Sequence, residues 1–179
     1  MTEILRLCLD LNIWCAALLA DFKGRQDTSC QYLVRIVRQG TCQLGPVQLI
    51  ISWGMLNRLR LVLERDLGVT PIGADLYIDA IRSYAILGAA GVSPQLTLGG
   101  TGIIALRDLE DAHVLETAFA GRANLLVTAN FRDFRSKETR ILIPERQGIY
   151  VAPNHSFHIV HPYLMMEWLK SGQISPINS

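Results

Sequence analysis

Carboxylates beside short apolar runs are the residues of this chain best suited to chemistry. Asp10 directly follows the apolar run at 4–9, and Asp108 and Asp111 follow a second run at 103–106. Oxygen ligands from separate elements suit Mg²⁺ or Mn²⁺, because Mg²⁺ uses only a few carboxylates and keeps several waters. Such an ion can activate water and offset the charge that develops during phosphodiester cleavage. The acids therefore predict a divalent-metal site.

Short apolar runs and helical patterns alternate along the chain and must position these acids. Runs too short for helices predict buried strands at 4–9, 47–51, 103–106 and 125–128. Apolar residues at helical spacing predict helices just after Asp10, over 29–39, from Ser52 to about 66, from Pro71, and from Asp108 or Leu109 to Gly121.

The stretch 103–134 indicates how these elements are arranged. Its order of strand, helix and strand implies parallel pairing with a right-handed crossover. Ligands of such sheets bind beyond the carboxyl ends of the strands, where Asp10, Asp111 and Thr128 are all expected to lie. The alternation predicts a three-layer α/β/α sandwich around a central, mostly parallel sheet.

The remaining segments are less regular. The range 88–102 is rich in Gly and small residues and predicts a loop, with a short edge strand at 95–98. A last short strand is expected at 149–151, a helix at 162–169, and a frayed tail at 171–179. The chain shows no repeat or low-complexity segment, so 1–179 is predicted to be a single domain.

Composition sets limits on the function. Half of the residues are hydrophobic and 18% are charged, which excludes a disordered chain. The net charge of +1 gives no global attraction to nucleic acid, so any basic surface must be local. The four cysteines form no CxxC pair and are interpreted as reduced thiols of a cytoplasmic protein. No secretory signal is recognisable, and no apolar run approaches the roughly 18–20 residues of a membrane span.

Four motifs, taken in order, resemble the PIN-domain family. They are LDLN at 9–12, S-x-x-x-L at 52–56, D-x-x-D-x-x-x-L-x-x-A at 108–118, and LLVTANFRDF at 125–134. The resemblance implies a central parallel sheet flanked by helices. It also implies a Mg²⁺- or Mn²⁺-dependent ribonuclease, a class that includes the VapC-type toxins of bacterial toxin–antitoxin pairs. Family sites hold a cluster of about three or four acids, which suits such hard cations.

The resemblance assigns roles position by position. It implies catalytic roles for Asp10, Asp111, Asn130 and Thr128, metal contacts for Asp10, Asp111 and Asp108, and site-lining positions for Asn12, Ser52, Arg58 and Asp133. Asp10 and Asp111 would be the main ligands. Asn130 would be a weak ligand or would position water, and Thr128 would orient a neighbour.

Two of the family's acidic positions are substituted. Arg58 stands where the family presents a glutamate, and Asn130 stands where it presents an aspartate. The site thereby loses two negative charges and gains a positive one. A guanidinium at this position could pair with Asp10 or Asp111 and take the place of the metal. We therefore expect weaker metal binding than in a member with all of the acids. Arg58 could also simply face solvent on the polar side of its helix.

Three function hypotheses remain from the sequence. The first is a metal-dependent RNA endonuclease, held by an antitoxin-like protein partner if it is of toxin type. The second is a catalytically weak or silent PIN domain that binds RNA or a protein, and the third is an interaction module without a nucleic-acid role. Arg132, Arg135 and Lys137 could follow an RNA backbone, although a solvated charged face explains them equally well. A homodimer is also expected from the resemblance.

Overall fold

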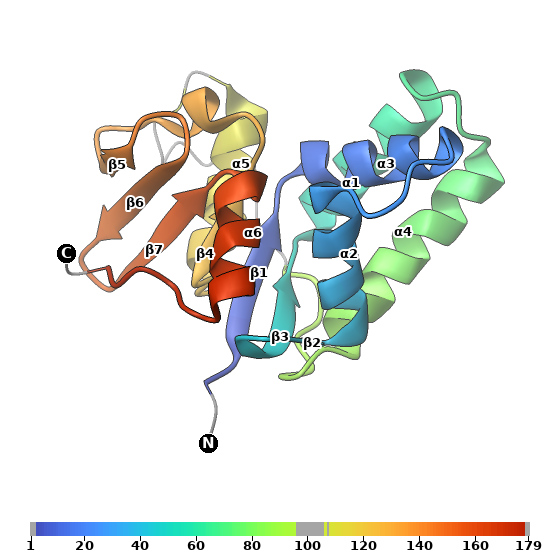
Figure 1. Cartoon of the computed structure of the whole chain (residues 1–179). Coiled ribbons are helices and arrows are strands. Elements are labelled where there is room, and N and C mark those ends of the chain that lie inside the picture. The colour runs from blue at the N-terminus through green and yellow to red at the C-terminus, as the bar shows by residue number, and fades with distance from the viewer. Residues whose placement is uncertain (1–2, 96–105, 107, 178–179) are drawn as a thin grey trace.

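The computed structural model describes residues 3–95, 106 and 108–177, which form one mixed sheet covered by helices (Figure 1). Within these residues the sheet has seven strands in the order β2-β3-β1-β4-β7-β6-β5. The strands are β1 Leu5–Leu9, β2 Thr41–Cys42, β3 Gly45–Ile50, β4 Leu125–Val127, β5 Thr139–Ile143, β6 Gln147–Ala152 and β7 His155–Val160. The helices are α1 Leu11–Phe22, α2 Ser29–Gln39, α3 Trp53–Arg65, α4 Pro71–Ile86, α5 Leu109–Ala120 and α6 Pro162–Ser171, with a 3₁₀ turn, η1, at Phe131–Phe134.

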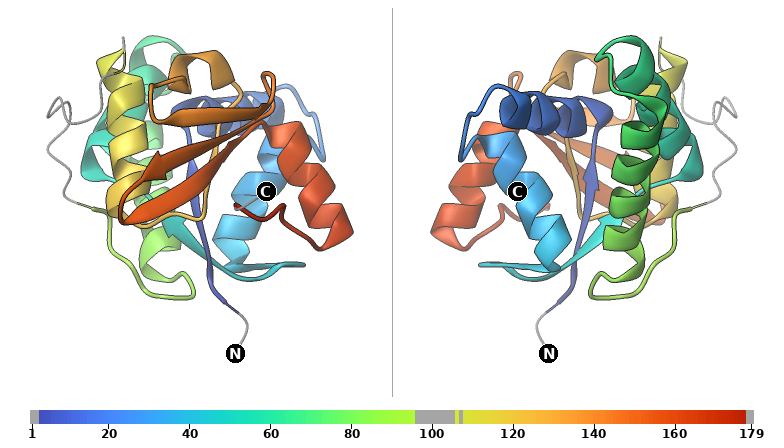
Figure 2. Two further views of the ribbon diagram at one scale, coloured as in Figure 1. Left: turned by 90° about the vertical axis from the view of Figure 1, so that its left-hand side faces the viewer. Right: turned by 90° about the vertical axis from the view of Figure 1, so that its right-hand side faces the viewer.

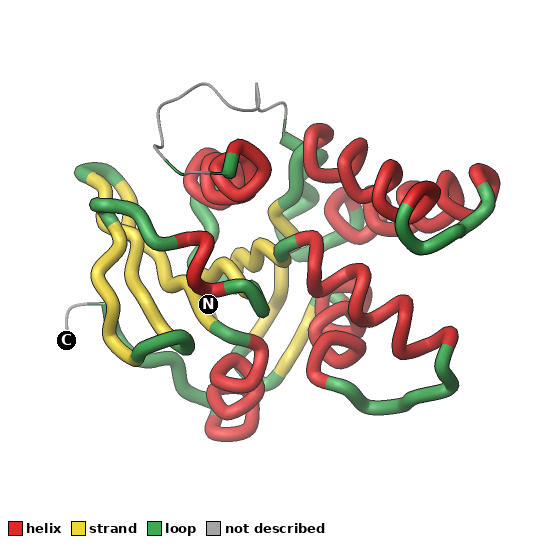
Figure 3. The backbone as a smooth tube through the Cα atoms, turned by 90° about the horizontal axis from the view of Figure 1, so that it is seen from above, coloured by secondary structure: helices red, strands yellow, loops and turns green. Residues whose placement is uncertain are grey.

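The four central strands β3, β1, β4 and β7 run parallel to one another. Antiparallel pairs extend the sheet at both edges, with β2 on β3 and with β6 and β5 beyond β7. Viewed from above, α5 lies on one side of the sheet and α6 on the other (Figures 2 and 3). The predicted three-layer sandwich with a mostly parallel centre is confirmed.

Local capping explains why the N-terminal helices begin and end where the sequence predicts. Thr28 and Gln31 form a reciprocal capping box at the start of α2, and Gly40 ends that helix with a positive φ of 67°. Ser52 caps α3 by accepting from the Met55 amide, and Pro71 occupies the first turn of α4. These caps orient the helices that flank the carboxyl edge of the sheet.

The C-terminal third corrects the sequence-based expectation. The predicted last strand at 149–151 is part of β6, and β5 and β7 flank it. The missed strand β7 carries His158 at a buried position, so its apolar pattern is interrupted. His158 Nε2 lies 2.8 Å from the Ser175 carbonyl oxygen, which satisfies the buried ring. Within the expected frayed tail, the carbonyl oxygens of Ser175 and Ile177 are contacted by side chains of the sheet.

Two predicted strands fall largely outside the described residues. The run at 103–106 lies there apart from Leu106, which has no strand conformation. Of the expected edge strand at 95–98, only Gln95 is described, and it forms an isolated parallel bridge with Ser52. No helix in the described part of the chain is long and apolar enough to cross a membrane.

Candidate metal-dependent site at the carboxyl edge of the sheet

Asp10 lies at the centre of the candidate site, where β1 gives way to α1. Its backbone amide bonds to the Val127 carbonyl, so the ends of β1 and β4 meet at this residue. Its Oδ1 caps α1 by accepting from the Leu11 amide at 2.6 Å. Its Oδ2 accepts from Asn12 Nδ2 and from Thr128 Oγ1, both at 2.7 Å. The side chain is 5% exposed and is therefore held in one orientation.

Thr128 connects Asp10 to the loop after β4. Its buried hydroxyl donates to Asp10 and accepts from the Asn130 amide at 3.0 Å. Asn12 strengthens the same junction, because its Oδ1 accepts from the Ala129 amide at 3.3 Å. The predicted grouping of Asp10, Asn12 and Thr128 is therefore present, and these residues join the ends of β1 and β4.

Asp111 approaches this junction from the first turn of α5. Asp108 caps the helix by accepting from the Glu110 amide at 2.8 Å. Asp108 itself is exposed. Asp111 is half-buried, and burial raises its pKa to about 7, helped by the negative charges of Asp10, Asp108, Asp133 and Glu110. This carboxyl group therefore lies in a strongly negative environment.

Asp10 also has a raised pKa, of about 6. Burial is the main cause, and the charge of Asp133 adds to it, whereas the hydrogen bonds from Thr128, Leu11 and Asn12 oppose the shift. A divalent cation would relieve the repulsion at both carboxylates. Groups with such raised pKa values in one place are typical of functional sites.

Asn130 and Asp133 interact directly with each other at the edge of this acidic group. The Asn130 Nδ2 donates to Asp133 Oδ2 across the 3₁₀ turn η1. Both side chains are exposed. The amide nitrogen of Asn130 is thereby directed at an acid, and its carbonyl oxygen remains the only ligand atom that this residue can offer.

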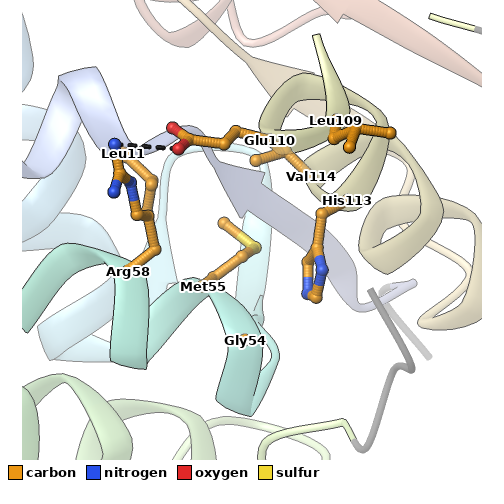
Figure 4. A pocket seen from close by; sticks show the side chains of 8 residues that line it. All are labelled: Leu11, Gly54, Met55, Arg58, Leu109, Glu110, His113 and Val114. Carbon is orange, nitrogen blue, oxygen red and sulfur yellow. Dashed lines mark ion pairs between the residues drawn. The ribbon is translucent and has the colours of Figure 1, made fainter. Parts of the chain in front are cut away.

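Arg58 does not occupy the position that the sequence predicts. Its Nη2 forms an ion pair with Glu110 Oε1 at 2.8 Å, and no ion pair of Arg58 with Asp10 or Asp111 is present in the described part of the chain (Figure 4). The prediction that it pairs with one of those aspartates is therefore corrected. Glu110 precedes Asp111 on α5, so the guanidinium is drawn to the neighbour of the predicted partner.

Ser52 lies beside α5 and away from Asp10 in the hydrogen-bond network. It is fully buried, accepts from the Met55 amide at 3.2 Å, and lies 3.0 Å from His113 Nε2. The Thr117 hydroxyl also donates to it, at 2.9 Å. Ser52 therefore joins α3 to α5. Sequence analysis did not identify His113 or Glu110 as site residues. The available signal was that Arg58 had no assigned partner on its own helix, while Glu110 was an acid on another predicted helix.

The three basic residues proposed for RNA contact are all exposed. Arg132 forms an ion pair with Glu145. Arg135 and Lys137 make no ion pair within the described ranges, so their charges are available to a ligand. Their role in RNA binding stays a prediction.

The side chains present fit a metal that is held only in part by the protein. No group of three or more His, Cys, Asp or Glu side chains in the described residues could hold an ion alone. Mg²⁺, however, is commonly bound by one or two carboxylates together with substrate phosphates and waters. Asp10 and Asp111 supply two such carboxylates, and Asn130 can supply a neutral oxygen. The donor set therefore suits an ion that arrives with, or is completed by, a phosphate.

Comparison with known families agrees with this fold. The PIN domain family matches residues 6–132, which include most of β1, all of α3, α5 and β4, and both aspartates. The chain belongs to the PIN domain family. That family indicates nuclease-type function in general, and its members generally depend on divalent metals. No curated protein and no solved structure matched the chain.

Proposed function

We propose that this protein is a Mg²⁺- or Mn²⁺-dependent RNA endonuclease that holds its metal weakly, between Asp10, Asp111 and a phosphate of the substrate. The observation that supports this most is the raised pKa of both aspartates, about 6 and about 7, at the carboxyl edge of a parallel sheet. The charge of Asp10 is one cause of the shift at Asp111, so the two act on the same region. Burial and neighbouring negative charges both disfavour the charged carboxylates, and a cation would stabilise them.

Each residue of the site has a distinct task in this proposal. A bound divalent ion would supply positive charge for the phosphate and would lower the pKa of an attacking water. Asp10 is pre-oriented by its bonds from Leu11, Asn12 and Thr128, so its carboxylate needs no reorganisation on binding. Asp111 completes the pair from α5. Exposed Arg135 and Lys137 would contact the RNA backbone.

A toxin-type role would add a protein partner. In that case an antitoxin-like protein would hold the nuclease inactive, and a homodimer would present two sites. The support is the order and spacing of the motifs from Asp10 to Phe134, which resemble VapC-type toxins.

A catalytically silent RNA- or protein-binding PIN domain is the second candidate. It is favoured by the ion pair between Arg58 and Glu110, because an arginine stands where the family presents an acid and is already bound to another acid of the protein. It is also favoured by Asn130, whose amide is bonded to Asp133. Arg58 and Asn130 each stand where the family presents an acid, so two negative charges that would attract a metal are absent.

Metal binding and RNA cleavage, measured together, separate the two candidates. Mn²⁺ titration by calorimetry would be run on the wild type, on Asp111→Asn as the negative control, and on the Arg58→Glu/Asn130→Asp double variant. Cleavage of an end-labelled single-stranded RNA would be followed in Mn²⁺ and in EDTA. Metal-dependent cleavage by the wild type that is lost in Asp111→Asn supports the nuclease.

The reverse pattern supports the silent domain. If only the double variant binds Mn²⁺ and cleaves RNA, the natural substitutions have removed activity. Arg60→Glu is a matched control for the charge change on α3, because Arg60 is exposed and pairs with Glu64 at 2.9 Å, outside the acidic group. If Arg60→Glu also gains Mn²⁺ binding and RNA cleavage, the gain in the double variant reflects only the general change of charge on α3.

A further inference from the structure

A pocket lies between α3 and α5, and Figure 4 shows the residues that line it. Its volume is about 300 Å³, which is at the lower end of small-ligand pockets. Two of its lining residues are chain neighbours of the proposed metal ligands. Leu11 follows Asp10 directly, and Glu110 precedes Asp111 directly. A group in this pocket would therefore be attached within a short distance of a phosphate at the aspartates.

The walls of the pocket are mostly apolar. Leu11, Met55, Leu109 and Val114 line it together with the bare backbone of Gly54. Met55 and Val114 are almost fully buried, so these walls belong to the packed core and are fixed in place. Apolar walls suit the faces of a planar ring, and RNA-binding proteins commonly take single unstacked bases into such sites.

The pocket is lined by one cation and one anion, which pair with each other, and by His113, which lies 3.0 Å from Ser52 Oγ. Arg58 and Glu110 reach toward each other from α3 and α5, as Figure 4 shows, and both side chains of this ion pair are partly exposed. Arg58 Nε is buried and has no hydrogen-bond partner in the described residues. A buried donor without an acceptor is costly, so this N–H favours a ligand that presents an acceptor.

Guanine matches this arrangement of donor and acceptor. Its O6 accepts hydrogen bonds and lies next to the N1–H and N2–H₂ donors, just as the guanidinium of Arg58 lies next to the carboxylate of Glu110. Arginine contacts to guanine O6 and N7 are the commonest specific contacts between proteins and bases. Arg58 would donate to O6, and Glu110 would accept from the N1 and N2 side.

We infer that this pocket binds a guanine base of RNA next to the phosphate held at Asp10 and Asp111. The choice of RNA rests on the proposed function. The ion pair of Arg58 with Glu110 then selects a nucleotide, and the arginine that stands in place of a family acid is a specificity residue. Metal affinity is lost at this position, and base recognition is gained.

Binding of mononucleotides in EDTA tests the inference without any metal or cleavage. NMR titration would compare GMP, AMP, CMP and UMP with ribose 5-phosphate, which has the phosphate but no base. We expect GMP to bind best and at least tenfold more tightly than ribose 5-phosphate. Equal affinity for GMP and ribose 5-phosphate, or a preference for another base, overturns the inference.

Arg58→Lys tests the guanidinium as a whole, because lysine keeps the positive charge but has none of its planar N–H donors. We expect it to weaken GMP binding about tenfold, the scale of one hydrogen bond to a charged group, and to leave ribose 5-phosphate unchanged. Arg60→Lys, two positions away at an exposed site on α3, should leave both unchanged. Unaltered GMP binding in Arg58→Lys overturns the inference.

Glu110→Gln keeps the inference testable if Arg58→Lys fails to fold. This exposed position at the start of α5 tolerates an amide, and the change should remove the preference for GMP over AMP. A preserved preference would contradict the assigned role. Because mononucleotides contain no bond between nucleotides, failure here leaves the nuclease proposal intact, and failed cleavage leaves base binding intact.

Discussion

The hydroxyl of Thr128 donates to Asp10 Oδ2 at 2.7 Å, and this bond links the ends of two neighbouring parallel strands inside the protein. Both residues are buried, so the bond is shielded from water. It is one of three contacts that oppose the effect of burial on the pKa of Asp10. The contact therefore stabilises the charged form of the proposed ligand as well as the fold.

Replacing Thr128 with valine should destabilise the protein by about 1–3 kcal/mol at pH 8, because a buried carboxylate would lose a donor without any loss of volume. Chemical denaturation measures the free energy of unfolding. Thr41→Val, on the exposed edge strand β2, is the control and should lie within about 0.5 kcal/mol of the wild type. Equal effects of the two changes would show that the Thr128 bond contributes nothing specific.

The stability of the metal-free protein should fall as pH rises from about 4 to about 7. Asp111 has a pKa of about 7 in the folded protein against an ordinary value of 3.8, so the folded state binds more protons in this window. Its favourable contribution is complete below the ordinary pKa and is lost as pH rises through about 7. Asp10, at about 6, acts in the same direction.

Asp111→Asn should consequently raise the melting temperature at pH 8 while abolishing metal binding. The gain is expected to be about 1 kcal/mol, because the half-exposed group is partly screened by water. Thermal unfolding at pH 5 and pH 8 checks this, and the gain should shrink at pH 5. Asp79→Asn, at an exposed position on α4, should change neither the melting temperature nor metal binding. A loss of stability in Asp111→Asn at pH 8 would refute the claim that burial and neighbouring acids make the charged Asp111 destabilising.

Two helix caps with equal local geometry allow the role of Ser52 to be measured. Ser52 and Thr70 each accept from the amide three residues later, at 3.2 Å. Ser52 additionally contacts His113 and Thr117, whereas Thr70 is exposed. Thr70→Ala should cost about 1 kcal/mol and Ser52→Ala about 2 kcal/mol or more in the free energy of unfolding. Equal losses would mean that the contacts between α3 and α5 add no stability.

Gly54→Ala should also disturb the junction of α3 with α5. A Cβ at this position would come within 2.1 Å of His113 Cε1, so the imidazole ring must move. We expect a loss of about 1–3 kcal/mol, although alanine normally favours a helix over glycine. The same change in a His113→Ala background should be neutral or stabilising, as a double-mutant cycle would reveal. If Gly54→Ala costs the same stability in the His113→Ala background, the clash with His113 is not the cause of the loss.

Arg135→Gln/Lys137→Gln should lower RNA affinity and its dependence on salt. For single strands each neutralised phosphate contributes about 0.7 to the slope of log affinity against log salt, so the slope should fall by about 1.4. Filter binding at several salt concentrations gives the slope. Lys23→Gln/Lys170→Gln removes two charges from other exposed positions and is the matched control. Equal slopes for both variants would exclude a specific RNA path at the η1–β5 segment.

The sequence predicts the meeting of Asp10 with Thr128 because parallel strands place their carboxyl ends at one edge of the sheet. It does not predict the partner of Arg58. Glu110 and Asp111 are adjacent on α5, and only the packing of α5 against α3 decides which of them the guanidinium reaches. Strand β7 was missed for a related reason, since His158 is buried through a contact with a distant carbonyl that no local pattern contains.

The order of the strands has a consequence for synthesis of the chain. β1 is made before both of its neighbours in the sheet, β3 and β4, and Asp10 and Thr128 are separated by 118 positions. Until β4 has left the ribosome, β1 has one unpaired edge and Asp10 lacks the hydroxyl that orients it. The candidate site therefore forms only after β4 has been synthesised, and a growing chain that ends before β4 cannot assemble it.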